Sequence, residues 1–83
     1  MYFVYAIYNQ KHNKIYIGQS QDLVQRLKLH NNHKFDKSYT SRFDGEWKLV
    51  YDEKCETRQK ALIREKQLKS QKGRLFIKQY FRP

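Results

Sequence analysis

Residues 2–8 read Tyr-Phe-Val-Tyr-Ala-Ile-Tyr, a run of aromatic and β-branched residues that is apolar at both alternating sets of positions. Such a run is typical of a strand covered on both faces and predicts the central strand of a sheet. Residues 9–13 are polar and turn-forming, and residues 14–18 read Lys-Ile-Tyr-Ile-Gly, so we expect a β-hairpin. If Tyr5 pairs directly with Tyr16, a tight turn falls over residues 10–11 and both phenols share one face.

The segment after the hairpin predicts a helix followed by a loop. Residues 21–31 fit a helix because Leu23, Val24 and Leu27 recur at helical spacing and form an apolar stripe. Residues 32–45 are polar, with Lys, Asp, Ser, Thr and Gly, which predicts a loop.

The second half predicts one more strand and two helices. Residues 47–52 read Trp-Lys-Leu-Val-Tyr-Asp, so every second residue is a large apolar one and one face of this strand is expected to be wetter. Thr57 can cap a helix over residues 58–70, and Gly73 is expected to interrupt the chain before a short helix over residues 74–81.

The element order is therefore ββαβαα over a single domain, residues 1–83. Its simplest packing is an α+β fold, in which helices flank a three-stranded antiparallel sheet.

Charge indicates the class of partner. Eighteen Lys and Arg against eight Asp and Glu give a formal net charge of +10. Such a balance favours an anionic partner, nucleic acid first and a membrane surface second. No stretch approaches the length needed to span a bilayer, and Cys55 has no second cysteine to pair with, so we expect a soluble, cytoplasmic protein. No helix combines a broad apolar face with a basic one, so we expect no membrane partner, and the sequence shows no obligate protein partner.

Basic residues concentrate in the C-terminal third of the chain. Residues 58–83 contain nine Lys and Arg and a single acid, Glu65. This segment is the predicted nucleic-acid-binding surface, with the following candidate contacts: Lys66, Lys69, Lys72 and Arg74.

Several polar side chains stand where a small core should be apolar. Tyr5 and Tyr16 are either ordinary core residues or members of a site. Arg26 and His30 lie one helical turn apart, as an exposed flank or as site residues. Glu65 falls on the apolar face of its helix, and burying a carboxylate is costly unless it is compensated. A salt bridge and a bound divalent cation both remain open as the compensation.

The spacing of these residues resembles that of the GIY-YIG nuclease family, and is similar to its small single-domain bacterial members across essentially the whole chain. The first motif corresponds to Phe3-Val4-Tyr5, where Phe3 and Val4 replace the family's glycine and isoleucine. The second motif, Tyr16-Ile17-Gly18, follows after ten residues. Some larger members use an asparagine after the glutamate, and Gln67 or a basic residue is the candidate replacement here.

The resemblance implies an endonuclease that hydrolyses phosphodiester bonds in DNA, dependent on Mg²⁺ or Mn²⁺, with a role in repair or recombination. By the same resemblance Tyr5 orients or deprotonates the attacking water and Tyr16 lines the site. Arg26 contacts the scissile phosphate, His30 matches the family's histidine one turn later, and Glu65 binds the metal.

Two hypotheses follow. The first is this metal-dependent endonuclease, with weak sequence specificity because phosphate contacts position a protein without specifying bases. The alternative is a catalytically idle nucleic-acid-binding module on the same fold. The loop aromatics Phe35, Tyr39 and Phe43 either stack on unpaired bases or pack the loop onto the core.

Overall fold

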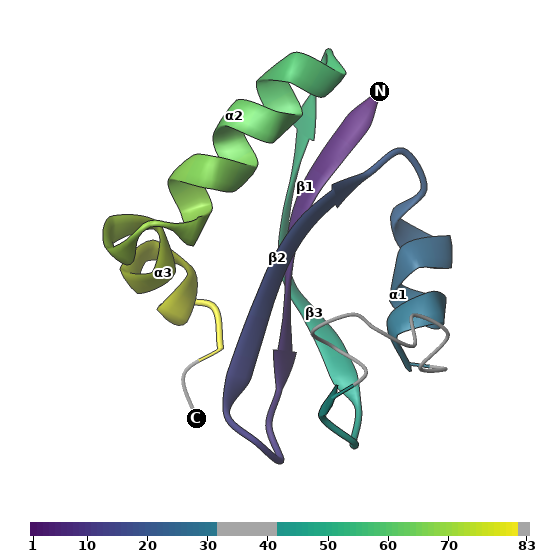
Figure 1. Ribbon diagram of the computed structural model, residues 1–83, viewed down its shortest axis with the longest axis vertical. Helices are drawn as coiled ribbons and strands as arrows, with labels where there is room; N and C mark the ends of the chain where they lie inside the picture. The colour runs from purple at the N-terminus through teal and green to yellow at the C-terminus, as the bar shows by residue number, and fades with distance from the viewer. Residues whose placement is uncertain (32–41, 82–83) are drawn as a thin grey trace.

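The computed structural model describes residues 1–31 and 42–81 and confirms the predicted order ββαβαα (Figure 1). Within those two ranges no helix is both long and apolar enough to cross a membrane. The loop aromatics Phe35 and Tyr39 lie outside the described residues. The elements have these bounds: β1 Tyr2–Asn9, β2 Lys14–Ser20, α1 Leu23–Asn31, β3 Trp47–Cys55, α2 Arg58–Lys69 and α3 Gln71–Lys78.

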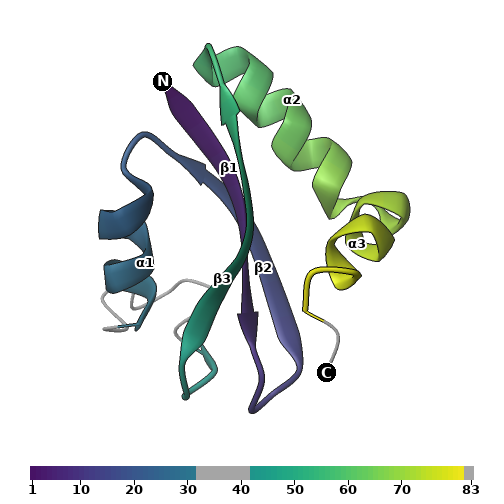
Figure 2. The same cartoon turned by 180° about the vertical axis from the view of Figure 1, so that it is seen from behind.

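The sheet is antiparallel with strand order β2-β1-β3, so β1 is the central strand, as its doubly apolar pattern predicted. One face is covered by α1 and the other by α2 and α3 (Figures 1 and 2). Each face has its own apolar cluster, because alternate β1 residues point to opposite sides. Val4 and Ala6 pack toward α2 and α3, and Tyr5 and Ile7 pack toward α1.

The hairpin register differs from the predicted one. Tyr5 pairs with Gly18 and Tyr16 pairs with Ile7, so the direct pairing of the two tyrosines was wrong by two residues. The turn spans residues 10–13 and not 10–11, and its last residue, Asn13, has a left-handed φ of 52°, a conformation that asparagine tolerates. A shift of two residues preserves the face, so both phenols still project from the same side.

A β-bulge changes the face of β3 midway along the strand. Ala6 pairs with Tyr51 and Ile7 with Leu49, which leaves Val50 as the extra residue. Trp47 therefore packs in the cluster on the α1 side, whereas Tyr51 packs on the side of α2 and α3. The expectation that alternate residues of this strand share one face holds only within each half of β3.

The first helix buries fewer apolar residues than its pattern predicted. Leu23 and Leu27 pack against the α1-side cluster, but Val24 is 67% exposed. The buried residue of α1 is His30. Phe43, from the end of the predicted loop, packs on this cluster beside Trp47, which favours the packing role over base stacking for this aromatic.

Ser70, and not Gly73, separates the last two helices. Thr57 caps α2 as predicted, by accepting a hydrogen bond from the backbone N–H of Lys60. Ser70 ends α2 and caps α3 by accepting from the N–H of Gly73. Gly73 lies inside α3 and is buried there, so the predicted interruption at this glycine was wrong. A Cβ at this position would lie 2.4 Å from the Cα of Leu68, hence glycine permits the two helices to pack closely.

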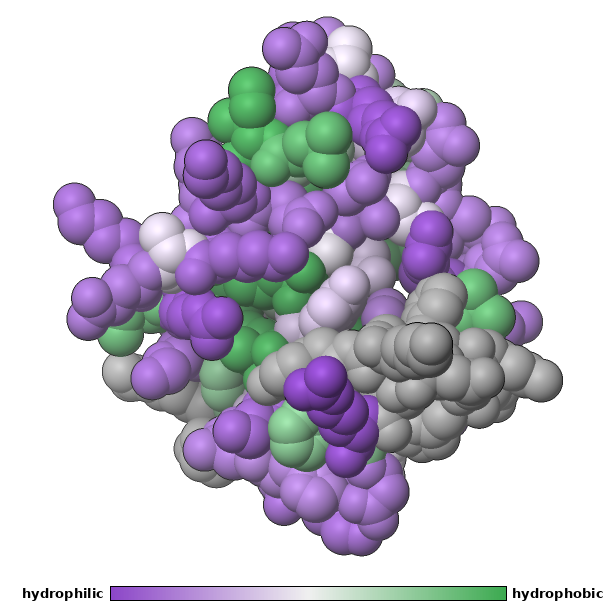
Figure 3. All heavy atoms as spheres, viewed as in Figure 1, coloured by the Kyte–Doolittle hydropathy of each residue, from purple (hydrophilic) through white to green (hydrophobic). Residues whose placement is uncertain are grey.

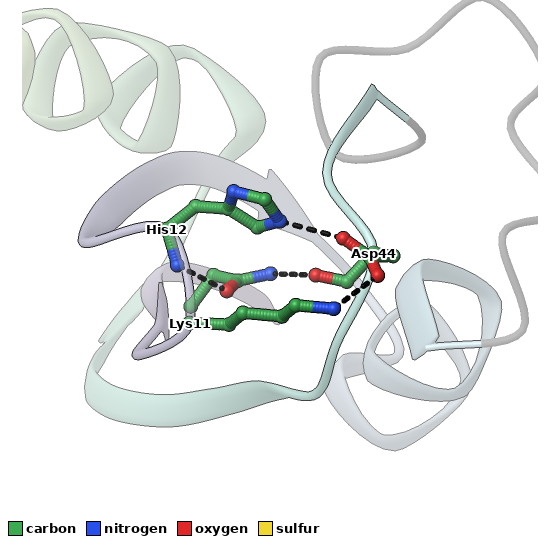
Figure 4. A network of polar contacts seen from close by, with 4 residues as sticks. Lys11, His12 and Asp44 are labelled. Atoms are coloured by element: carbon green, nitrogen blue, oxygen red, sulfur yellow. Dashed lines mark hydrogen bonds and ion pairs between the residues drawn. The ribbon is translucent and has the colours of Figure 1, made fainter.

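A polar network ties the hairpin turn to the segment that leads into β3 (Figure 4). The carboxylate of Asp44 accepts from Lys11 Nζ and lies 2.6 Å from His12 Nε2, while buried Asn9 donates to the backbone carbonyl of Asp44. These hydrogen bonds from Lys11 and His12 lower the pKa of Asp44 to about 2. The network fixes the start of β3 against the end of β1.

Candidate active site

Tyr5 and His30 meet on the α1 side of the sheet. Tyr5 is 2% exposed in the centre of β1, and its hydroxyl lies 2.9 Å from Nε2 of His30. His30 is equally buried, at 2% exposure in the last turn of α1. The two side chains come from elements 25 positions apart, so this contact depends on how α1 packs on the sheet.

Tyr16 completes an aromatic cluster with these two side chains. Its ring centroid lies 5.0 Å from that of His30 and 6.4 Å from that of Tyr5. Gly18, which pairs with Tyr5 across the hairpin, leaves the space that the phenols occupy. A Cβ on Gly18 would lie 2.8 Å from the Tyr5 hydroxyl oxygen and 3.0 Å from Cε2 of Tyr16.

Gly18 is a contributor whose role the sequence reasoning missed, although the glycine itself was quoted in the second motif. The available signal was a glycine inside a strand, which marks a close approach of another group to the backbone. Here the approaching group is the hydroxyl of Tyr5.

Arg26 contributes positive charge to the same cluster. It lies on α1, one turn before His30, and its side chain is exposed. Burial, followed by the charge of Arg26, lowers the pKa of His30 to about 4, so the imidazole is neutral near pH 7. Burial is also the main cause that raises the pKa of the Tyr5 hydroxyl. Among smaller effects, Tyr16 and Glu65 raise this pKa further and Arg26 lowers it.

Glu65 approaches from α2, on the other side of the sheet from α1. Its carboxylate is close enough to raise the pKa of Tyr5, and its side chain is 19% exposed. Its Oε2 accepts from Nζ of Lys69 at 2.7 Å, one turn later on the same helix. The salt bridge that the sequence left open is therefore present. The five candidate residues come from four elements. His30 contacts the Tyr5 hydroxyl, and the other three shift its pKa.

A family model described as the GIY-YIG catalytic domain matches residues 1–80 of the 83-residue chain. The chain belongs to the GIY-YIG family. Comparisons with curated proteins and with solved structures gave no match.

Membership of the GIY-YIG family indicates the class of activity. Its members are nucleases of the endonuclease type, generally dependent on a divalent metal, and a nuclease domain implies a nucleic-acid substrate. The resemblance to GIY-YIG nucleases and the α+β fold predicted from the sequence are both confirmed. The roles of individual residues remain predictions.

The predicted nucleic-acid contacts of this GIY-YIG domain divide between different parts of the surface. Lys69 and Arg74 line a hollow of about 320 Å³ together with Tyr16. We call this the Arg74 hollow; it comprises Ile15, Tyr16, Ile17, Lys69 and Arg74. Lys72 lines a separate hollow with Phe76, and Lys66 is exposed on α2. Only the Arg74 hollow shares a residue with the aromatic cluster.

Gln67, the candidate replacement for the asparagine of larger GIY-YIG members, lines the hollow of Lys72 and Phe76. Its side-chain oxygen accepts from Nη1 of Arg64 at 3.2 Å. This placement separates Gln67 from the Arg74 hollow, so nothing in its contacts supports a role beside Tyr16.

Proposed function

We propose that this protein is a divalent-metal-dependent endonuclease that hydrolyses phosphodiester bonds in DNA with weak sequence specificity. The observation that carries the proposal is the convergence on the Tyr5 hydroxyl. His30 is in hydrogen-bond contact with this hydroxyl, and Gly18 leaves room for it. The charges of Arg26 and Glu65 both shift its pKa.

The residues present fit a hard cation bound largely through water and phosphate. Within the described residues there is no group of three or more His, Cys, Asp or Glu that could enclose a metal. Glu65 offers a single accessible carboxylate, and Mg²⁺ keeps several waters and needs few protein ligands where substrate phosphate supplies the others. When bound there, such a cation would stabilise negative charge on the phosphate oxygens and acidify a bound water.

Tyr5 is proposed to orient the attacking water through its hydroxyl oxygen. The raised pKa of this buried phenol keeps it protonated near neutral pH, so it is a poor base. His30 is neutral, and with its ring proton on Nδ1 it accepts a hydrogen bond from the Tyr5 hydroxyl at Nε2. A phenol that donates to one partner becomes a better acceptor for another, because hydrogen bonds polarise one another. The Tyr5 oxygen can then accept from the water.

Arg26 is proposed to bind the scissile phosphate. Its side chain is exposed, yet its charge is close enough to lower the pKa of Tyr5 and of His30. A phosphate bound beside Tyr5 would therefore be close enough for Arg26 to contact. The planar fork donates two hydrogen bonds to phosphate oxygens and stabilises the charge that develops on them in the transition state. Tyr16, whose ring packs beside Tyr5 and His30, also lines the Arg74 hollow.

The test is cleavage of labelled single-stranded and duplex DNA in Mg²⁺ or Mn²⁺, with and without EDTA, by wild type and Glu65→Gln. We expect the substitution to reduce EDTA-sensitive cleavage about 100-fold or more, because stabilisation of the phosphate charge is lost. DNA binding should be unchanged or tighter, since a negative charge has been removed from a basic surface.

Glu56→Gln is the matched control. It removes the ion pair of Glu56 with Lys60, which has the same i,i+4 spacing on the same helix as that of Glu65 with Lys69. Each such pair contributes less than about 1 kcal/mol, so neither variant should unfold. Cleavage that persists in EDTA, or equal effects of the two substitutions, would remove the metal role of Glu65. Binding without cleavage by the wild type would establish the idle binding module.

A further inference from the structure

A second basic hollow lies beside Arg26. It has a volume of about 380 Å³, within the range of ligand pockets, and Arg26 and Arg58 both line it. Gln19, Gln25 and Asp22 contribute to its wall. We call this the Arg58 hollow. Arg58 was not among the residues that the sequence singled out, because it is one of nine bases in its segment.

Residues of one strand line both basic hollows, and in sequence they flank Gly18 of the candidate active site. Ile15, Tyr16 and Ile17 line the Arg74 hollow, whereas Gln19 and Ser20 line the Arg58 hollow. Gly18, which faces the Tyr5 hydroxyl, lies between them in sequence. All belong to β2, an edge strand at the front of the molecule in Figure 1.

The length of β2 between the two hollows suits several phosphates of one nucleic-acid strand. Residues 16–20 span about 13 Å of extended chain. A duplex strand advances about 3.4 Å per nucleotide, so such a span corresponds to about four nucleotides. The face containing β2 is largely hydrophilic around a central apolar area, as the space-filling view shows (Figure 3).

The charge of Arg58 is not neutralised by an ion pair with any residue that the structure describes. Arg58 is exposed, whereas Lys60 two positions later pairs with Glu56. Arg58 is the first residue of α2, where the helix dipole disfavours a cation, and no acid lies in this first turn. The one acid in the wall, Asp22, accepts from the backbone N–H of Gln25 and so caps α1. The hollow is left with an excess of positive charge.

We propose that Arg58 binds the phosphate next to the scissile one, so that the DNA strand crosses the β2 edge from the Arg58 hollow to the Arg74 hollow. This inference rests on the proposed nuclease function and adds the path of the substrate to it. Arg58 supplies a bidentate phosphate contact, and the glutamine side chains of the hollow offer further donors to the backbone.

The experiment combines Arg58→Ala with removal of single phosphate charges. Methylphosphonate linkages are placed one at a time around the cleavage position of the DNA substrate that wild type cleaves fastest. We expect Arg58→Ala to reduce kcat/KM on unmodified DNA about tenfold, the loss expected for one charge-assisted hydrogen-bonded contact. One linkage beside the scissile phosphate should reduce wild-type kcat/KM similarly, yet cause no further loss in Arg58→Ala.

Lys60→Ala is the control, because it removes the same charge from the same turn of α2. We expect the effects of Lys60→Ala and of each methylphosphonate to multiply. The melting temperature of Arg58→Ala should equal or exceed that of wild type, which excludes misfolding as the cause. Equal rates for the Arg58 and Lys60 variants, or losses that multiply at every linkage, would overturn the proposed path while leaving the nuclease function intact.

If wild type cleaves no DNA, the nuclease proposal fails. The Kd of each variant for each of the same oligonucleotides is then measured by fluorescence anisotropy in metal-free buffer. Non-multiplicative losses in Kd at one linkage would still place a phosphate at Arg58. Multiplicative losses, or no binding at all, would overturn the contact.

Discussion

The hydroxyl of Tyr5 is the polar group that side chains of both the sheet and the helices affect. The Tyr5 ring is buried with Ile7 and Trp47, yet its hydroxyl is in hydrogen-bond contact with His30. Within the described part of the chain, no buried side-chain nitrogen or oxygen lacks a hydrogen-bond partner. A buried polar atom without a partner is costly, so the Tyr5–His30 contact stabilises the fold as well as arranging the site.

The neutral state of His30 makes the stability of the fold pH-dependent. Its pKa is lowered to about 4 in the folded protein from an ordinary 6.5, so the unfolded chain binds the extra proton first. The contribution of the neutral imidazole to stability is complete above pH 6.5. It is lost as the pH falls toward 4, which lowers the free energy of unfolding by up to about 3 kcal/mol. Urea denaturation of wild type and His30→Gln across this window measures it.

The His30→Gln variant should show a flatter pH dependence between pH 6.5 and 4. Asp44 does not interfere, because its pKa is lowered to about 2 and its contribution is lost only between its ordinary value of 3.8 and that value. Parallel stability curves for the two proteins would contradict the buried neutral imidazole.

Gly18 provides a second prediction at the scale of single residues. Gly18→Ala introduces a Cβ 2.8 Å from the Tyr5 hydroxyl, so that hydroxyl must move from its place beside His30. We expect cleavage to fall about 100-fold, as for a displacement of catalytic groups by about 1 Å. The free energy of unfolding should fall by only about 1–3 kcal/mol, the usual cost of overpacking. Single-turnover cleavage and urea denaturation measure the two effects.

Ile17→Val is the control for Gly18→Ala. It changes the adjacent buried residue of β2, whose side chain lies on the opposite face of the sheet, and typically costs about 0.5–1.5 kcal/mol. If both variants lose cleavage in proportion to stability, Gly18 has only a structural role.

At the scale of elements, two opposing effects on stability are expected for a substitution of Gly73, at the junction between α2 and α3. In an exposed helix interior, Gly→Ala stabilises by about 1 kcal/mol. At Gly73 the added Cβ would lie 2.4 Å from Gln67 O and 2.4 Å from Leu68 Cα, which are backbone atoms that cannot rotate away. We expect the steric effect to dominate, because displacing packed backbone costs about 1–3 kcal/mol.

Gly73→Ala should therefore lower the urea midpoint, opposite to the effect that helix propensity alone predicts. Lys72→Ala, at the exposed neighbouring position, should change stability by less than about 0.5 kcal/mol. A Gly73→Ala variant as stable as wild type would show that the two helices do not pack as closely as described.

At the scale of the whole molecule, helices on both faces leave β2 as an edge strand between α1 and the pair α2 and α3 (Figures 1 and 2). The aromatic cluster of Tyr5, Tyr16 and His30 lies on the α1 face, and the Arg74 hollow is formed where α2 and α3 meet the same edge. A net charge of +10 attracts DNA to the whole surface, and Tyr16, Lys69 and Arg74 line the hollow at this edge.

Two charge reversals in α3 test this arrangement. Arg74→Glu changes the Arg74 hollow, and Lys72→Glu changes the hollow that contains Phe76, by the same net charge. We expect Arg74→Glu to weaken DNA binding about tenfold more than Lys72→Glu and to reduce the slope of log Kd against log salt by about 1 more. Anisotropy titrations at several salt concentrations measure both. Equal weakening would indicate that the overall charge, and not the β2 edge, determines binding.

The amino-acid sequence by itself determined the order of the elements and the residue types of the site. The doubly apolar run over residues 2–8 required a central strand, and Thr57 marked the start of α2, because both signals depend on neighbouring residues alone. The motif residues Tyr5 and Tyr16 also kept a common face although their register was wrong, since a shift of two residues conserves side-chain direction.

The tertiary structure alone decided which of these residues meet. The hairpin adopted a register in which Tyr5 pairs with Gly18, and the bulge at Val50 sent Trp47 and Tyr51 to opposite faces. The packing of α1 buried His30 against Tyr5 and made its imidazole neutral. Bases that form one run in sequence were divided among different hollows by the α2–α3 junction. Each outcome depends on contacts between residues distant in the chain, and spacing and propensity describe only local ones.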